Sequence, residues 1–177
     1  GVYNNKIFFD YGYTDHTYNT TERSPQLVYN VPLGTKVRAI ASGVVTSINP
    51  VYSGDLTIFV VNPETPSWNY EHEHVINPHV NEADYVVAGQ KIPEVSNYSQ
   101  WLRNSGYGVV DIGLFKPARN FPGHHCPLRY MNESLKQDYF EKIKALYTSW
   151  EDYEKNTTIY DENSYAMPDC IVDKPLF

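Results

Sequence analysis

Two histidines, His72 and His74, stand two positions apart in the stretch 68–75, whose residues favour a β-strand. Side chains at alternate positions of a strand point to the same face of its sheet, so the two imidazoles could bind one metal ion together. A histidine in a strand can equally be a hydrogen-bonded or exposed residue without a ligand. Glu71 and Glu73 alternate with the histidines and are expected on the opposite face.

A second run of potential ligands is His124-His125-Cys126. Adjacent side chains diverge, which disfavours a shared metal ion, and Cys126 has a better use. The chain holds 2 cysteines, and Cys126 and Cys170 flank the helix expected near the C-terminus, so we predict a disulfide between them. Closing a loop of this length contributes roughly 4 kcal/mol in the chain-entropy account. Only a free Cys126 could act as a nucleophile with a histidine base.

Composition narrows the classes of partner. The formal net charge of the 177 residues is −7, and no basic stripe is present to neutralise phosphates, which argues against nucleic acid and against an anionic membrane surface. No run of apolar residues is long enough to span a bilayer. The 16 tyrosines are typical of half-buried β faces and of binding surfaces.

Two features favour an exported protein. One is the isolated cysteine pair, and the other is the set of Asn-x-Ser/Thr sequons at Asn19, Asn97, Asn132 and Asn156. We therefore expect a secreted, periplasmic or extracellular location. The expected partner is a protein, peptide or glycan of the cell envelope or extracellular space.

The elements that must position these residues are mostly short strands. Residues 1–33 are expected to be irregular apart from a strand at 6–11. Strands are then predicted at 35–41, 43–48, 56–61, 68–75 and 108–115, with a short pair at 86–87 and glycine, proline and asparagine turns between them. A helical turn is expected within 96–104, and 117–127 is expected to be a loop.

A helix is predicted from Asn132 or Ser134 to about Tyr153. Its apolar residues recur at three- and four-residue steps and form one stripe, which favours packing on the β domain over a partner surface. These residues are Leu135, Tyr139, Ile143, Leu146, Tyr147, Trp150 and Tyr153. We divide the chain into a β domain at 1–116 and a helix with a disulfide-tied tail at 117–177, packed on the same domain.

The segments 32–45 (PLGTKVRAIASGVV) and 72–92 (HEHVINPHVNEADYVVAGQKI) resemble, in order, motifs of the lysostaphin/LytM-type zinc endopeptidases. The resemblance covers roughly residues 24–115. It implies a mostly β, LytM-like antiparallel sheet or sandwich, here with a C-terminal amphipathic helix and tail. It is stronger support for the fold than for an activity, because one fold carries many functions.

The resemblance also says where zinc ligands and catalytic histidines would stand. The first His and Asp ligands of the family fall on Ser24 and Val28, and its late His-x-His falls on Val109 and Asp111. Neither valine nor a neutral serine replaces a zinc ligand. Val109 falls on one catalytic histidine of the family and Asp111 on a metal-binding histidine, whereas His74 falls on the other catalytic histidine and is the one of these that is kept. If a loop insertion shifts the count, Asp15 or His16 would supply ligands instead.

Two functions remain open on this basis. The favoured one is a non-catalytic binding or scaffolding domain derived from a peptidase fold, without a cofactor. The alternative is a zinc-dependent hydrolase with a rebuilt site on His72, His74 and Asp111, since two histidines and a carboxylate can hold a catalytic zinc. In either case the aromatic residues expected to line a ligand groove are Tyr52, Trp68, Tyr70, Tyr98, Trp101 and Tyr107.

Overall fold

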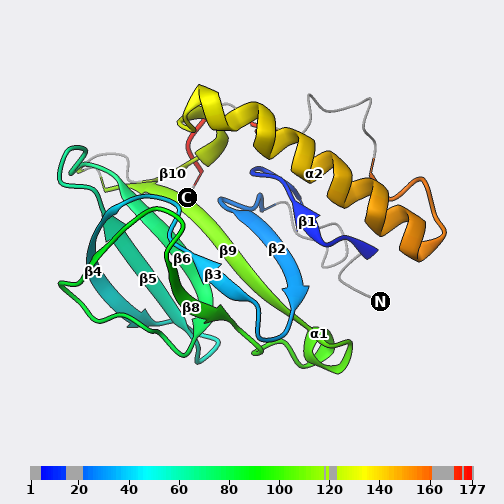
Figure 1. Cartoon of the computed structure of the whole chain (residues 1–177), viewed down its shortest axis with the longest axis horizontal. Helices are drawn as coiled ribbons and strands as arrows, with labels where there is room; N and C mark the ends of the chain where they lie inside the picture. The colour runs from blue at the N-terminus through cyan, green and yellow to red at the C-terminus, as the bar shows by residue number, and fades with distance from the viewer. Residues whose placement is uncertain are drawn as a thin grey trace.

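An antiparallel sheet organises the molecule (Figure 1). The computed structural model describes residues 5–14, 22–117, 119, 123–160, 170–172 and 174–176. The strands of the main path, in spatial order, are β1 (Phe8–Phe9), β2 (Leu27–Pro32), β9 (Tyr107–Lys116), β6 (Asn69–Ile76), β5 (Leu56–Val61), β4 (Gly43–Pro50) and β7 (Tyr85–Val86). The mostly β, LytM-like fold class predicted from the sequence is confirmed.

Three further strands extend this path. β10 (Gly123–His125) pairs with β9, β3 (Lys36–Arg38) pairs with β8 (Lys91–Val95), and β8 also pairs with β6. β10 corrects the prediction that 117–127 is a loop throughout. Of the strand predicted at 35–41, only Lys36–Arg38 forms a strand. β3 pairs with β8, and the register of this pairing shifts between Lys36 and Arg38.

β2 corrects the prediction that residues 1–33 are irregular beyond one early strand. It is a six-residue strand between β1 and β9, and it pairs with β9 over its whole length. Apolar residues stand on both of its faces, so it lacks the alternation of apolar and polar residues that marks a half-buried strand. Asn30 is buried, and its side-chain amide donates to the Lys6 carbonyl oxygen.

Two helices and a short 3₁₀ turn, η3 (Pro127–Arg129), complete the described elements: α1 (Gln100–Asn104) and α2 (Glu133–Glu154). Asn132 caps α2, since its side-chain oxygen accepts from the Ser134 N–H. α2 lies along β1 and β2 (Figure 1). The centre of its predicted apolar stripe is buried at Ile143, Tyr147 and Trp150, whereas Leu135 and Tyr153 near its ends are exposed. None of the described helices is long and apolar enough to cross a membrane.

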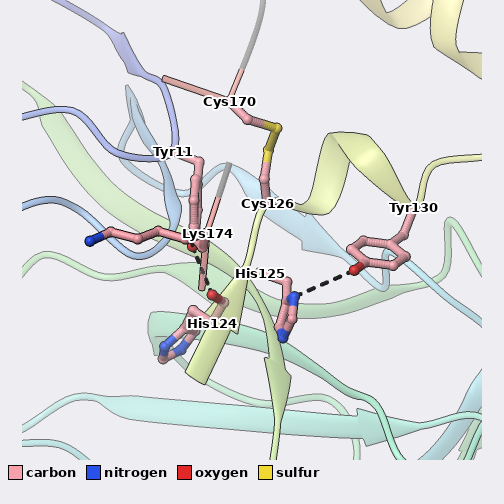
Figure 2. The surroundings of a disulfide bond; sticks show 7 residues. All are labelled: Tyr11, His124, His125, Cys126, Tyr130, Cys170 and Lys174. Carbon is pink, nitrogen blue, oxygen red and sulfur yellow. Dashed lines mark hydrogen bonds between the residues drawn. A yellow bond between two sulfur atoms is a disulfide. The ribbon is translucent and has the colours of Figure 1, made fainter. Parts of the chain in front are cut away.

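The predicted disulfide is present. Cys126 and Cys170 are bonded, with their Cα atoms 5.8 Å apart (Figure 2). Beside the bond, the Tyr11 hydroxyl donates to the carbonyl oxygens of His124 and Lys174 at 2.7 and 3.0 Å. The disulfide and Tyr11 therefore fasten the C-terminal segment to both β10 and the N-terminal segment.

Candidate functional site

The two faces of β2 and β9 border different cavities. Val28 of β2 and Val109 and Asp111 of β9 line a cavity of about 340 Å³. The alternate residues of the same strands line a cavity of about 900 Å³ between the sheet and α2. Because successive side chains of a strand point to opposite faces, this division fixes which residues can meet.

The smaller cavity collects the positions that the family resemblance assigned to metal ligands and to a catalytic histidine. Ser24, Val28, Val109 and Asp111 all line it. Val28 and Asp111 are directly opposite each other in the pairing of β2 with β9. Four positions that are separated in the sequence therefore line one cavity. Asp15 and His16, named as substitutes, lie outside the described residues.

Among the described residues, Asp111 is one of three charged residues that line this cavity, together with Glu22 and Arg23. Its Oδ1 atom is buried and has no hydrogen-bond partner among the described residues. Burial raises the pKa of Asp111 well above its usual value, and the negative charges of Glu73, Glu71 and Asp55 raise it further. An unpartnered carboxyl in this setting is a costly feature for a site without a ligand.

His74 reaches the Asp111 side of the sheet through a β-bulge. Glu73 pairs with Thr57 and Val75 with Leu56, so His74 is an extra residue in β6, and its φ is +58°. The buried imidazole lies with Nδ1 3.1 Å from Asp55 Oδ2, and its ring stacks on Tyr98 with centroids 4.4 Å apart. The Asp55 carboxylate favours a proton on Nδ1, which leaves Nε2 as the basic nitrogen.

His72 lies on the other face, which corrects the expectation that the two histidines point the same way. In the pairing of β6 with β9, Glu73 is opposite Asp111 and His72 is opposite Ile112. The His72 side chain is fully buried, its Nε2 accepts from the Ile40 N–H at 3.2 Å, and its Nδ1 is 3.4 Å from the Ile58 carbonyl oxygen.

The set His72, His74 and Asp111 therefore does not converge. Among the described residues, no group of three or more His, Cys, Asp and Glu side chains is placed to hold a metal ion. The side chains at the family's three zinc positions do not fit zinc either: Val28 offers no donor atom, Ser24 Oγ donates to the Gln26 carbonyl oxygen at 2.8 Å, and Asp111 is left as the one carboxylate. The residues that the structure describes therefore do not fit a zinc ion.

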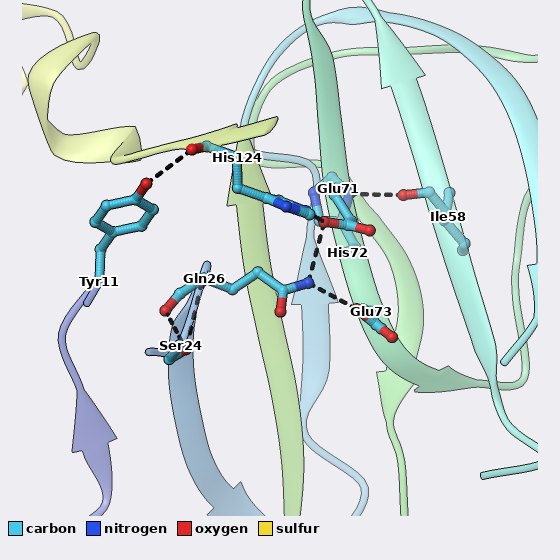
Figure 3. A network of polar contacts seen from close by, with 8 residues as sticks. All are labelled: Tyr11, Ser24, Gln26, Ile58, Glu71, His72, Glu73 and His124. Atoms are coloured by element: carbon cyan, nitrogen blue, oxygen red, sulfur yellow. Dashed lines mark hydrogen bonds and ion pairs between the residues drawn. The ribbon is translucent and has the colours of Figure 1, made fainter. Parts of the chain in front are cut away.

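Glu71 and Glu73 share the face of Asp111 instead of facing away from the site. Figure 3 shows Gln26 between them: its side-chain amide donates to Glu71 at 3.0 Å and to Glu73 at 2.6 Å. His124 Nε2 lies 2.6 Å from Glu71 Oε2. Gln26 was missed from the sequence. His124 was named there only as a member of the run His124-His125-Cys126, and its contact with Glu71 was not predicted.

The run His124-His125-Cys126 diverges as predicted. His124 contacts Glu71 on one side, whereas the His125 ring packs edge-to-face on Trp68 with centroids 4.9 Å apart. Cys126 turns to its disulfide partner (Figure 2). The three side chains do not form a common site.

The six aromatic residues expected in one groove are divided among different places. Tyr98 lines the smaller cavity, and Tyr52 is an exposed residue whose ring is 6.1 Å from that of His74. Trp68 and Tyr70 line the larger cavity on the opposite face. The two remaining residues are Trp101, half exposed on α1, and Tyr107, whose ring packs on Trp150.

Comparison with solved structures identifies the architecture. The catalytic domain of the antimicrobial peptidase lysostaphin from Staphylococcus simulans superposes with a TM-score of 0.55 and 19% identity, covering 69% of this chain and 88% of that chain. The chain has the lysostaphin-type peptidase fold. A mutant catalytic domain of the prophage-encoded M23 protein EnpA from Enterococcus faecalis has this fold too, with a TM-score of 0.52, 22% identity, and 68% and 88% of the two chains covered.

LytU shares the lysostaphin-type fold with a TM-score of 0.55 and 16% identity over 70% of this chain and 83% of that chain. The chain spans about half of the lysostaphin solved in solution by NMR, 48% of which it covers. No protein-family model matches the sequence. No curated protein matches it either. The likeness is therefore one of fold, at identities too low to carry an activity with it.

Proposed function

We propose that the chain is a non-catalytic binding or scaffolding domain of the cell envelope or extracellular space, and that the smaller cavity is its recognition site. The observation that carries this proposal is the meeting of Ser24, Val28, Val109 and Asp111 around one cavity. These are the positions at which the family resemblance places a peptidase centre. At these four positions, however, the side chains supply one carboxylate, where a catalytic zinc needs about three protein ligands.

Without a metal ion, the site would lack the chemistry of peptide hydrolysis, while the smaller cavity could still bind a ligand. A metallopeptidase uses its metal to polarise the scissile carbonyl and to activate water. His74, held by Asp55, could still move a proton. A proton carrier without an activated water gives no peptide cleavage above background, so binding is the function that these residues support.

Two observations support the proposed ligand class and the proposed location: the first concerns the ligand and the second the location. Lysostaphin is named as an antimicrobial peptidase, so a peptide is the natural occupant of a cavity at this point of the fold. The disulfide between Cys126 and Cys170 suits an oxidising compartment outside the cytoplasm. A peptide or peptide-bearing glycan of the envelope satisfies both.

The experiment is to incubate the purified protein with a pentaglycine peptide and, separately, with isolated cell-wall material. New amino termini report cleavage and co-sedimentation reports binding. We expect co-sedimentation without cleavage, and we expect Asp111→Asn to weaken it. The matched control is Glu64→Gln, which removes an exposed carboxylate in the turn between β5 and β6 and should leave binding unchanged.

The same assay tests the zinc hydrolase. It is run with zinc added and then with a chelator. Release of amino termini that the chelator stops, and that disappears in His74→Ala, would overturn the binding proposal and establish a metal-dependent enzyme. Absence of co-sedimentation with every cell-wall preparation would also overturn it.

A further inference from the structure

The larger cavity, of about 900 Å³, lies on the face of β2 and β9 that the proposed recognition site does not use. Its floor is apolar, and it includes Val31 of β2 and Ile112 of β9. Tyr29 and Tyr139 also line it, and their hydroxyl oxygens lie 2.5 Å apart and bond to each other. Because the polar ends of these two rings satisfy each other, the floor suits a hydrocarbon ligand.

Several apolar side chains of this cavity remain in contact with solvent. Ile40, Tyr130 and Leu135 line it, and they are 41%, 55% and 59% exposed. Tyr70 and Met131, in the same lining, are half-buried. Exposed apolar side chains that gather around one concave place are typical of binding sites. A ligand in the cavity would remove part of this area from water.

One wall of the cavity belongs to α2, which lies outside the segment 24–115 that resembles the peptidase family. Another wall is formed by β3 and the residues just after it. β3 pairs with β8 and not with β2, so it is not part of the floor. The cavity therefore depends on a helix that the family motifs do not include.

α2 runs along the cavity from the Leu114 end of β9 towards its Tyr107 end. The helix follows β10 and η3, and β10 pairs with β9 from Leu114 onwards. Further along the helix, the Tyr139 hydroxyl meets that of Tyr29 in β2, and Trp150 packs on Tyr107 with ring centroids 6.1 Å apart. The first turns of α2 and its later turns therefore border different ends of the cavity.

The two ends of the cavity differ in chemistry. Trp68 and Tyr130 line it at the end near β10, and their ring centroids lie 4.8 Å apart. At the other end its lining includes two lysines. Lys36 follows the turn that joins β2 to β3, and Lys142 is one helical turn beyond Tyr139 on α2. An aromatic end and a basic end match an elongated ligand with an apolar tail and an acidic head group.

Positive charge predominates among the described residues that line the cavity. Lys36, Arg38 and Lys142 line it, against the one carboxylate of Asp138, in a chain whose formal net charge is −7. Lys36 contacts Glu94, and Lys142 pairs with Asp138 at 2.6 Å. The Arg38 guanidinium donates to a backbone carbonyl oxygen of the turn between β7 and β8. Ion pairs at exposed positions are weak, so both ammonium groups can turn to a second anion.

We propose that the larger cavity binds a fatty carboxylate, with its hydrocarbon chain on the apolar floor towards Trp68 and its carboxylate at Lys36 and Lys142. This site is separate from the smaller cavity and goes beyond the proposed function. A volume of about 900 Å³ is near the upper end of ligand-pocket volumes, which leaves room for a long single chain. Lysine supplies the head group with a compact positive charge on a flexible stem.

The test is an NMR titration of the whole isotope-labelled chain with butanoate, hexanoate and octanoate, each well below its micellar concentration. Affinity should rise roughly fourfold with each added methylene, because each one buried removes apolar area from water. Octan-1-ol and octylammonium carry the same chain with a neutral and a positive head group. Octanoate should bind roughly tenfold more tightly than octan-1-ol, and octylammonium should bind most weakly.

The same spectra locate the ligand. Shifts of the Ile112 and Leu135 methyl groups would place it in the larger cavity, whereas shifts confined to the Val28 and Val109 methyl groups would place it in the smaller one and overturn the inference. Affinity that does not depend on chain length would also overturn it. So would octan-1-ol or octylammonium that binds as tightly as octanoate.

Variants at exposed positions separate the tail from the head group. Leu135→Ala should lower the affinity for octanoate and octan-1-ol alike, roughly threefold, and Tyr153→Ala, an exposed position of α2 outside the cavity lining, is its matched control. The double variant Lys36→Gln, Lys142→Gln should lower octanoate affinity roughly tenfold and leave octan-1-ol binding unchanged. Lys144→Gln, on α2 but not in the cavity lining, should change neither. A preference for octanoate that survives the double variant would refute the assignment.

Discussion

The buried His72 should make the protein unfold more easily in acid. Burial lowers the pKa of His72 from 6.5 to about 4 in the folded state. The unfolded chain therefore binds a proton at a higher pH than the folded chain does. The contribution of neutral His72 to the free energy of unfolding is therefore fully present above pH 6.5. It is lost as the pH falls through about 4.

The magnitude follows from the two pKa values. A shift of one pKa unit is worth about 1.4 kcal/mol, so the full penalty is on the order of 3 kcal/mol and is reached only near pH 4. Between pH 7 and pH 5 the loss is about 2 kcal/mol by the same linkage. That is a large part of the stability of an ordinary domain, about 5–15 kcal/mol.

Urea unfolding measured at several pH values tests this reasoning. The variant is His72→Gln, because a glutamine amide can accept from the Ile40 N–H and donate to the Ile58 carbonyl oxygen without titrating. Its absolute stability can fall, but its loss between pH 7 and pH 5 should be about 2 kcal/mol smaller than that of the parent protein. His79→Gln, at an exposed position, is the matched control and should keep the parent pH dependence. Equal pH dependence in the parent and His72→Gln would refute the argument.

Three further predictions concern stability. The pKa of Asp111 is raised in the folded state, so burying this carboxyl costs no stability below its usual pKa of 3.8 and costs stability increasingly as the pH rises. Asp111→Asn should therefore raise the stability of the protein to urea at pH 7 and leave it unchanged at about pH 3.5. Reducing Cys126–Cys170 should cost roughly 4 kcal/mol and speed hydrogen exchange at Leu176, which pairs with β10, before the amides of the central strands change. Gly43→Ala should cost roughly 1–3 kcal/mol in the same unfolding assay, because its Cβ would lie 2.4 Å from the Val61 carbonyl oxygen.

The sequence predicted those strands and helices whose own residues carry a recognisable pattern. The strands β4, β5, β6 and β9 follow alternation and turn residues, and α2 follows its apolar stripe and its Asn132 cap. The disulfide followed from the number and position of the cysteines. β2 was missed because apolar residues stand on both of its faces, so its sequence shows no alternation of apolar and polar residues.

The site was predictable in part, and the failure has a specific cause. Motif spacing located Ser24, Val28, Val109 and Asp111 around one cavity. The convergence of His72 with Asp111 depended on which residues of β6 and β9 are opposite each other, and a register cannot be read from either strand alone. The bulge at His74 added a second error, since it shifts the alternation of side chains by one residue.

The pairing of β6 with β9 also explains why a carboxyl at position 111 indicates a functional role. A residue with a purely structural role there would be apolar like Val109, or neutral like asparagine, because burial and the charge of Glu73 both disfavour an ionised side chain. Asp111 thus destabilises the empty domain. If Asp111→Asn raises stability while it abolishes co-sedimentation with cell-wall material, the carboxyl serves recognition at the expense of the fold, which is the trade-off expected of a binding residue.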